Sequence, residues 1–222
     1  MRRACVALAL FGVLAAVPMT NLGQAQELTT IKLLEPNTER GLPVMKALSV
    51  RASAREWSDR KMELQDMSDL LWAANGINRP DKKRTASSAM NAQDVDIYVF
   101  VKAGAYLYDA AAHALVPVLA GDHIAEIMMT RQGAPSGPQS QPPVQIVLVS
   151  DISRFRMGET AQKLEWAALD TGIVSQNIAL FCAATGLGTR PRASLAKDKI
   201  KELLKLSDTQ YPMLNHPVGY IK

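Results

Sequence analysis

The sequence predicts an α+β fold, in which strands and helices are mixed along the chain and pack around one sheet. Three segments carry this prediction. Residues 95–109, "VDIYVFVKAGAYLYD", alternate apolar and polar side chains around a turn at Gly104, which is typical of a β-hairpin. Residues 144–150, "VQIVLVS", are apolar on both faces, which indicates a central strand. Residues 161–185 are long and apolar enough to form one long helix.

The first 25 residues have the pattern of a secretory signal peptide. Two arginines precede an apolar run over residues 4–17, and small residues come just before the expected cleavage after Ala25. A short membrane anchor is the alternative, but the apolar run is short and a polar segment follows it. We therefore expect residues 1–25 to be removed. Residues 26–222 should then form a single domain that is periplasmic or secreted, without stable insertion in the membrane.

Composition argues against several classes of function. The formal net charge of +4 falls to +2 when Arg2 and Arg3 leave with the signal, and no basic stripe remains to attract a nucleic acid. Cys182 then becomes the only cysteine, so no intrachain disulfide is expected, and its apolar surroundings favour a packed thiol. No metal site is expected either, because the histidines are far apart and match no ligand pattern: His113, His123 and His216.

Two helices are predicted before the hairpin. Residues 26–40 are too polar to bury and should form an extended arm. Apolar residues recur at helical spacing in 41–50, which predicts a short amphipathic helix. A second helix over residues 67–76 has a good N-cap in Ser68 or Asp66 and ends at a glycine.

The second half of the chain continues the mixed pattern. Residues 115–119 read as a short strand, and a short helix follows Asp122. Four prolines and two glycines in residues 131–143 exclude regular structure and indicate a surface loop that gates the substrate. The long helix is rich in small residues, which would let two helices approach closely. A last helix near residues 196–206 precedes an extended tail over 211–222.

One short segment has the chemistry of a phosphate site. Residues 51–55, "RASAR", place Arg51, Ser53 and Arg55 at alternate positions, so an extended backbone would present all three on one side. Two guanidinium groups and a hydroxyl facing one way suit a phosphate monoester. A solvated helix end is the alternative explanation for the same residues.

Four quoted segments together resemble the nitroreductase family of flavoproteins. They are "SVRASAREW" at 49–57, the stretch from Leu70 to Phe100, "GAYLYD" at 104–109 and "SQNIALFCAATGLGTRPRAS" at 175–194. Within that family the chain is most similar to the SagB-type subgroup, named for the azoline dehydrogenases of peptide maturation. The resemblance spans most of the chain from about residue 35 onwards, and the run from Leu70 to Tyr98 is its most specific part.

The resemblance implies FMN as the cofactor, bound at the interface of a homodimer. Residues 51–53 would hold the phosphate, and Arg55 would reach toward the pyrimidine side of the flavin. The amides of the Ser-x-x-Asn-x-Gln segment would contact the ring edge or the ribityl chain, and the loop after the long helix would offer backbone N–H groups near N5. The implied cofactor-binding residues are Arg51, Ala52, Ser53, Arg55, Ser88, Asn91, Gln93, Pro191, Arg192, Ala193 and Ser194.

This resemblance also implies an FMN-dependent oxidoreductase with a nitroreductase-like fold and an exchanged C-terminal tail. Catalysis would be flavin-based with no catalytic side chain, and a hydride would pass through N5 from a reduced donor to a small organic acceptor such as a nitro or quinone compound. NADH and NADPH are not expected outside the cytoplasm, so export would call for another donor or for FMN loading before export.

The sequence departs from the family at three places. Ser87 stands where a proline is usual, Ser194 stands where a glycine is common, and the chain ends soon after Gly219 without the basic C-terminal phosphate ligands of larger relatives. Arg190 and Arg192 are candidates to replace those ligands. The alternative function is a periplasmic, non-catalytic binding or scaffold protein that keeps the same fold.

Overall fold

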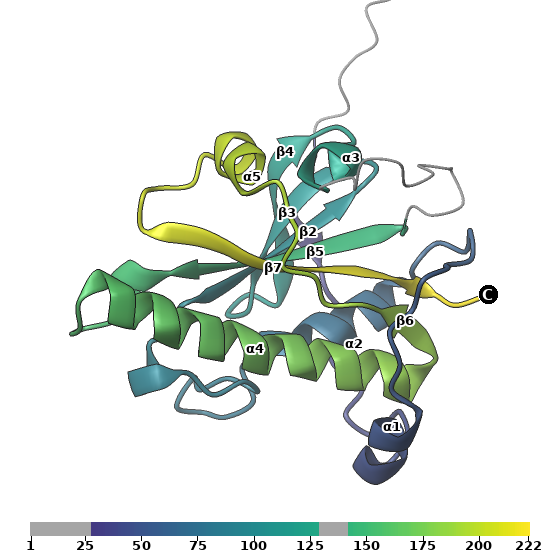
Figure 1. Ribbon diagram of the computed structural model, residues 1–222. Coiled ribbons are helices and arrows are strands. Elements are labelled where there is room, and N and C mark those ends of the chain that lie inside the picture. The colour runs from purple at the N-terminus through teal and green to yellow at the C-terminus, as the bar shows by residue number, and fades with distance from the viewer. Residues whose placement is uncertain (1–27, 129–141) are drawn as a thin grey trace, which may run out of the picture.

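A seven-stranded sheet, antiparallel throughout, forms the centre of the computed structural model, which describes residues 28–128 and 142–222 (Figure 1). The predicted signal peptide and residues 131–141 of the predicted gating loop lie outside these ranges. In spatial order the strands are β1 (Ile31–Lys32), β4 (Ala114–Ala120), β3 (Gly104–Asp109), β2 (Val95–Val101), β5 (Val144–Asp151), β7 (Gln210–Tyr220) and β6 (Leu187–Thr189).

Helices cover both faces of this sheet (Figure 1). On one face lie α2 (Leu64–Asn75) and α4 (Thr160–Thr185), and on the other lie α3 (Ile124–Ile127) and α5 (Lys197–Leu204). Two short 3₁₀ turns, η1 (Ala89–Asn91) and η3 (Ile152–Arg154), flank the sheet, and α1 (Val44–Val50) contacts α4. The α+β prediction is confirmed.

The central position predicted for residues 144–150 is confirmed by β5. Ile146 and Leu148 belong to the core under α2 and α4, whereas Val147 and Val149 belong to the core under α3 and α5. Because successive side chains of a strand point to opposite faces, a strand covered by helices on both sides must be apolar at every position. This is the pattern that the sequence shows.

The predicted hairpin forms as β2 and β3, but Gly104 has a different role from the one expected. The turn falls at Lys102 and Ala103, and Gly104 is the first residue of β3. A Cβ atom on Gly104 would lie 2.3 Å from the carbonyl oxygen of Leu119 on β4. Glycine is therefore required because two backbones approach closely, and not because the turn needs its conformational freedom.

The long helix α4 spans nearly the residues predicted and ends at Gly186, whose φ of 78° gives a left-handed C-cap. Its buried side includes Cys182, and burial raises the pKa of that thiol well above its ordinary range. The packed, unreactive cysteine expected from sequence is confirmed. Length and composition would also suit a membrane span, but core helices commonly meet the same two criteria, and this helix packs on the sheet.

The C-terminal tail differs from its prediction. Residues 210–220 form β7, which pairs with β5 on one side and β6 on the other in the same chain. The ladder hydrogen bonds of both pairings and the complete burial of Val218 hold the strand there. The tail predicted over 211–222 is therefore extended but belongs to the sheet of its own chain as far as Tyr220, and its exchange with a partner stays a prediction.

The short helix α1 is amphipathic as predicted, yet its apolar side is not covered. Ala47 is its single buried residue, and Met45 is 75% exposed. Leu42 and Leu48 are also exposed. Such a cluster of exposed apolar side chains is uncommon on a monomer and is typical of a contact surface.

Candidate functional site

Residues 51–55 follow α1 as an extended segment beside β6, as the alternating pattern required. Ser53 forms a parallel bridge with Thr189, and the Ala54 N–H donates to the Thr189 carbonyl oxygen over 2.9 Å. A Cβ atom on Gly188 would lie 2.7 Å from the Ala54 Cβ, so the glycine lets this segment lie against the strand. The structure thereby brings the 51–55 segment next to the residues that follow β6.

Three arginines lie close enough to repel one another at this junction: Arg55, Arg190 and Arg192. Burial lowers the pKa of Arg190, and the positive charges of Arg192 and Arg55 lower it further. The Nε atom of Arg190 is buried, and no hydrogen-bond partner for it occurs in residues 28–128 and 142–222. A buried donor among like charges is unfavourable unless an anion joins it. The junction therefore fits the phosphate of a nucleotide cofactor.

The loop after β6 is held to β7 by the backbone. Arg192 and Asn215 exchange two hydrogen bonds, of 2.9 and 2.8 Å, and the Asn215 side chain donates to the Ser194 carbonyl oxygen over 3.4 Å. Pro191, Ala193 and Ser194 are exposed, so this loop presents its outer side to solvent. The sequence did not single out Asn215, which lies buried in β7 and acts on the loop only through the tertiary fold.

The segment before β2 is a strained and heavily bonded loop. Met90, Asn91 and Gln93 all have left-handed backbone angles, with φ of 54°, 52° and 49°. The Ser88 hydroxyl accepts from the Gln93 N–H over 2.9 Å, and the Gln93 side chain accepts from Arg84 Nε over 2.9 Å. Asn91 is exposed, and its side-chain oxygen accepts from Gln93 Nε2 over 3.3 Å. Non-glycine residues with such angles persist only where their surroundings fix them, and they concentrate at functional sites.

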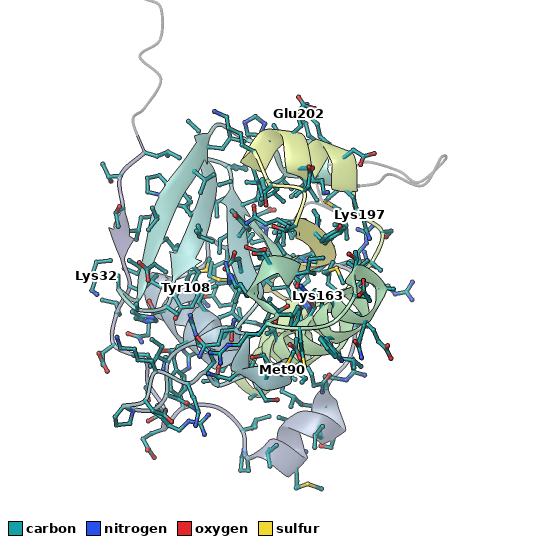
Figure 2. The ribbon with its side chains drawn as sticks, turned by 90° about the vertical axis from the view of Figure 1, so that its left-hand side faces the viewer. Lys32, Met90, Tyr108, Lys163, Lys197 and Glu202 are labelled. Carbon is teal, nitrogen blue, oxygen red and sulfur yellow. The ribbon has the colours of Figure 1, made fainter. Side chains whose placement is uncertain are left out.

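The two groups of predicted site residues are held by different elements of one chain. The Ser88–Gln93 segment lies beside the middle of α4, where the Ala89 N–H bonds to Asp170 (Met90 in Figure 2), whereas residues 51–55 lie against β6 (Figure 1). Among the described residues, no hydrogen bond or β-bridge joins the two segments. The sequence suggested a single convergent site, and within one chain its two groups make no such contact.

The buried histidine of β7 has a structural role. His216 is completely buried, and its ring nitrogens lie 2.9 Å from the Ser175 hydroxyl and 3.1 Å from the Thr189 hydroxyl. Burial lowers the pKa of His216 to about 3, so the ring is neutral and ties β7 to α4 and β6. No cluster of potential metal ligands occurs among the described residues.

Comparison with known proteins identifies the family. The sequence profile of the nitroreductase family matches residues 48–220, and the chain therefore belongs to this family. A Methanocaldococcus jannaschii protein named as a nitroreductase is 25% identical over 199 residues, which cover 86% of this chain and 96% of that protein. The chain is accordingly an oxidoreductase of a family that typically binds flavin.

Solved structures share the fold. A Ralstonia eutropha JMP134 protein described as a nitroreductase is 30% identical, with a TM-score of 0.79 over 95% of this chain and 97% of that chain. A chain of the E. coli microcin synthetase McbBCD complex has a TM-score of 0.64 at 16% identity, over 95% of this chain and 85% of that chain. At that identity the second likeness shows the fold alone.

Proposed function

We propose that this protein is an FMN-dependent oxidoreductase that passes reducing equivalents from a reduced donor to a small organic acceptor such as a nitro or quinone compound. The observation that carries the proposal is the junction of Arg55, Arg190 and Arg192. These cations lie at the predicted phosphate segment, and the charges that act on Arg190 are both positive. An anionic cofactor phosphate would supply the missing counter-charge.

Each group of residues has a distinct task in this proposal. Arg51, Ser53 and Arg190 bind the phosphate, and Arg55 stabilises negative charge that develops on the pyrimidine side of the ring. In the loop at 191–194, the backbone N–H groups of Ala193 and Ser194 would face the N5 edge, because Pro191 has no N–H and that of Arg192 donates to Asn215. When bound, FMN supplies the hydride chemistry, so the protein needs no acid or base of its own.

We propose that a second copy of the chain completes the site. The two groups of predicted contacts are held by different elements of one chain, and an antiparallel partner would bring its own Ser88–Gln93 segment to the arginine junction. The outward side of α4 suits such a contact, because Leu169 and Ile173 are 61% and 38% exposed and a Cβ atom on Gly172 would meet nothing within 4 Å. The exposed apolar side of α1 extends the same type of surface.

Replacing Arg190 by alanine tests the phosphate site. We expect the purified protein, residues 26–222, to show a bound-flavin absorbance spectrum that bleaches under anaerobic dithionite and returns in air. The Arg190→Ala variant should bind FMN about 10- to 100-fold more weakly, because hydrogen bonds to charged groups contribute about 1.5–3 kcal/mol. Exposed Arg156 offers a matched control, and Arg156→Ala should bind FMN normally. A colourless protein that ignores added FMN would instead favour the non-catalytic scaffold.

We also propose that the protein is exported and belongs to the SagB-type subgroup. Export is supported by the pattern of residues 1–25, and the subgroup by the run from Leu70 to Tyr98. The mass of the protein recovered from the periplasm or medium would give the cleavage site, which we expect after Ala25. Recovery of the uncleaved chain from the cytoplasm would contradict export and would restore NADH or NADPH as candidate donors.

A further inference from the structure

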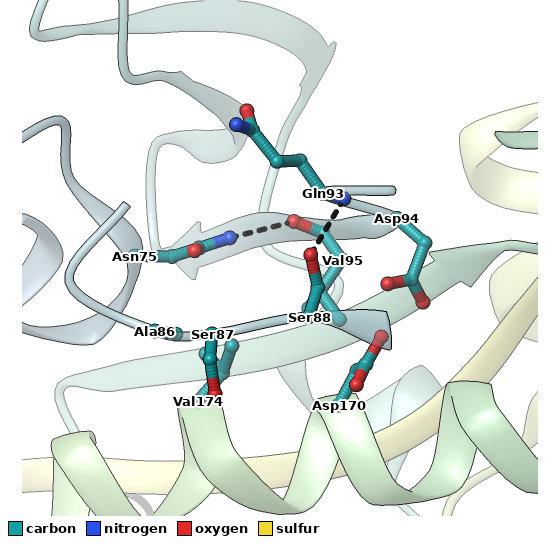
Figure 3. Close-up of a pocket in the computed structure, with 9 residues that line it drawn as sticks. All are labelled: Asn75, Ala86, Ser87, Ser88, Gln93, Asp94, Val95, Asp170 and Val174. Carbon is teal, nitrogen blue, oxygen red and sulfur yellow. Dashed lines mark hydrogen bonds between the residues drawn. The ribbon is translucent and has the colours of Figure 1, made fainter. Parts of the chain in front are cut away.

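Two aspartates lie buried against one another beneath the loop that precedes β2. Asp94, which immediately precedes β2, is 0% exposed, and Asp170 on α4 is 4% exposed. Figure 3 shows their carboxyl groups facing each other between the loop and the helix. Both line a small hollow together with Asn75, Ser87 and Ser88. Asp170 is the one carboxylate on the buried side of α4, three residues after Ala167 and four before Val174.

The hydrogen bonds of this pair leave one oxygen unaccounted for. The Ser150 hydroxyl donates to Asp94 Oδ2, and both oxygens of Asp170 accept from the Ala89 N–H, at 3.0 and 2.8 Å. The remaining oxygen, Asp94 Oδ1, is buried and has no donor among the residues that the structure describes. A buried carboxylate oxygen without a donor is costly, whereas a protonated oxygen at that place would itself donate to Asp170.

The cations nearby are engaged elsewhere. Arg154 on η3 bonds bidentately to Asp96 and also contacts Asp151, and its Nη1 donates to the Gln93 carbonyl oxygen. Arg84 donates to the Gln93 side chain and to the Asn75 carbonyl oxygen. These four side chains, Arg84, Asp96, Asp151 and Arg154, are the charged groups on the loop, β2, β5 and η3 around the pair, and Arg154 adds only a weak attraction for Asp94.

Two buried carboxylates without a cation between them cannot both be ionised at low cost. Burial, together with the neighbouring Asp170, raises the pKa of Asp94 to about 7 against the lowering effect of the Ser150 hydrogen bond. Below about pH 7 the pair therefore keeps a proton on Asp94, which joins the two carboxyl groups.

The pair controls the position of the loop through Asp170. The Ala89 N–H begins η1, and the left-handed residues Met90 and Asn91 follow directly. Strained backbone of this kind persists only where its surroundings fix it. The bifurcated hydrogen bond from the Ala89 N–H to both oxygens of Asp170 fixes the start of this turn. A second negative charge on Asp94 would push Asp170 away from the position that holds Ala89.

We propose that Asp94 and Asp170 share one proton and act as a positioning pair that holds residues 89–93 in the conformation that contacts the flavin. This inference rests on the proposed function, because the contact of the loop with FMN is part of that proposal. Loss of the shared proton should loosen the loop, so that FMN affinity falls as the pH rises above neutrality.

The test compares FMN dissociation constants at pH 6 and pH 9 for the dimeric protein and for Asp94→Asn. The introduced amide can accept from Ser150 and donate to Asp170 at any pH, as the protonated acid does. From pH 6 to pH 9, the FMN affinity of the unsubstituted protein should fall by at least about 10-fold more than that of Asp94→Asn. The reason is that the charge of an ionised neighbour shifts a pKa by about one unit or more, and one unit corresponds to a factor of ten in an equilibrium constant. The FMN phosphate also titrates, but it does so equally in both proteins.

Further variants separate positioning from a merely structural role. Asp170→Ala should weaken FMN binding at both pH values, and Asp170→Asn should rescue it, because an amide can still accept from Ala89 and donate to Asp94. Exposed Asp208 provides the control, and Asp208→Asn should keep the pH dependence of the unsubstituted protein. An identical pH dependence in Asp94→Asn and the unsubstituted protein would overturn the proposal.

A failure of the proposed function is distinguishable from a failure of this inference. Infrared spectra should show the carbonyl band of a protonated carboxylic acid at pH 6 that disappears in Asp94→Asn, whether or not FMN binds. Hydrogen exchange of residues 84–93, corrected for the intrinsic rate, should accelerate between pH 6 and pH 9 only when Asp94 is present. Absence of FMN binding at every pH would contradict the proposed oxidoreductase function. Persistence of the carbonyl band in Asp94→Asn, or the same hydrogen exchange of residues 84–93 at pH 6 and pH 9, would contradict the shared proton.

Discussion

The Asp94→Asn variant is expected to be more stable than the unsubstituted protein at pH 8, by up to about 4 kcal/mol in the free energy of unfolding. The pKa of Asp94 is raised from its ordinary value of 3.8 to about 7 in the folded state, so folding retains a proton that the unfolded chain releases. The associated stability is complete below about pH 4 and is lost as the pH rises through about 7. A difference of about three units at 1.36 kcal/mol each gives the stated magnitude.

Denaturant unfolding at pH 4, 6 and 8, at one protein concentration and without flavin, measures this effect. The difference in the free energy of unfolding between the two proteins is the informative quantity. His216 also makes this free energy depend on pH, in the opposite direction from Asp94, but it does so equally in both proteins. Its pKa is lowered to about 3, so that its stabilising effect is present above pH 6.5 and declines as the pH falls. The two proteins should be equally stable at pH 4 and diverge toward pH 8. A constant difference at all three pH values would show that Asp94 is ionised throughout.

The Leu169→Glu variant is expected to dissociate the homodimer and to lose FMN with it. Leu169 is 61% exposed on the outward side of α4, so a glutamate there leaves the core of one chain intact. In the proposed dimer the same carboxylate would become buried against apolar side chains without a cation, which costs several kcal/mol and corresponds to at least about 100-fold in the dimer dissociation constant. FMN should be lost because its two sets of contacts come from different chains.

Analytical ultracentrifugation and the flavin absorbance spectrum check both parts. Val118→Glu is a suitable control, since Val118 is 41% exposed on β4, away from α4, and its substitution should leave a dimer with bound flavin. A Leu169→Glu protein that remains dimeric would place the interface elsewhere. A monomeric variant that still binds FMN normally would show that one chain suffices for the site.

The class of fold and most elements could be predicted because they depend on local patterns. The both-faced apolar run at residues 144–150, the alternation in 95–101 and the helix ending at Gly186 each record a burial environment in the sequence. The extended backbone considered for residues 51–55 is confirmed by the bridge of Ser53, whereas the alternative of a helix end is not. Periodicity reports which sides of an element are buried, and it identified these elements within a few residues.

The missed features depend on what lies opposite each residue. Gly104 is needed because β4 approaches it, and residues 210–220 form a strand because β5 and β6 flank them. In both cases the neighbouring strand is distant in sequence, so the local pattern of residues does not reveal it. Asp94 had a faint signal as an acid before a buried strand, but its partner is 76 positions away. Whether two acids share a proton depends on their distance and burial.

The sequence alone therefore determined the fold class, the four strands β2 to β5 and the residue types suited to a phosphate and a flat ring. Tertiary structure decided that the arginines at 55, 190 and 192 come close to one another, that the Ser88–Gln93 loop is held instead beside α4, and that its anchor belongs to a buried acid pair. The reason is physical: hydrophobic periodicity acts along one element, whereas electrostatic interactions and hydrogen bonds depend on distances between elements that only the packed chain fixes.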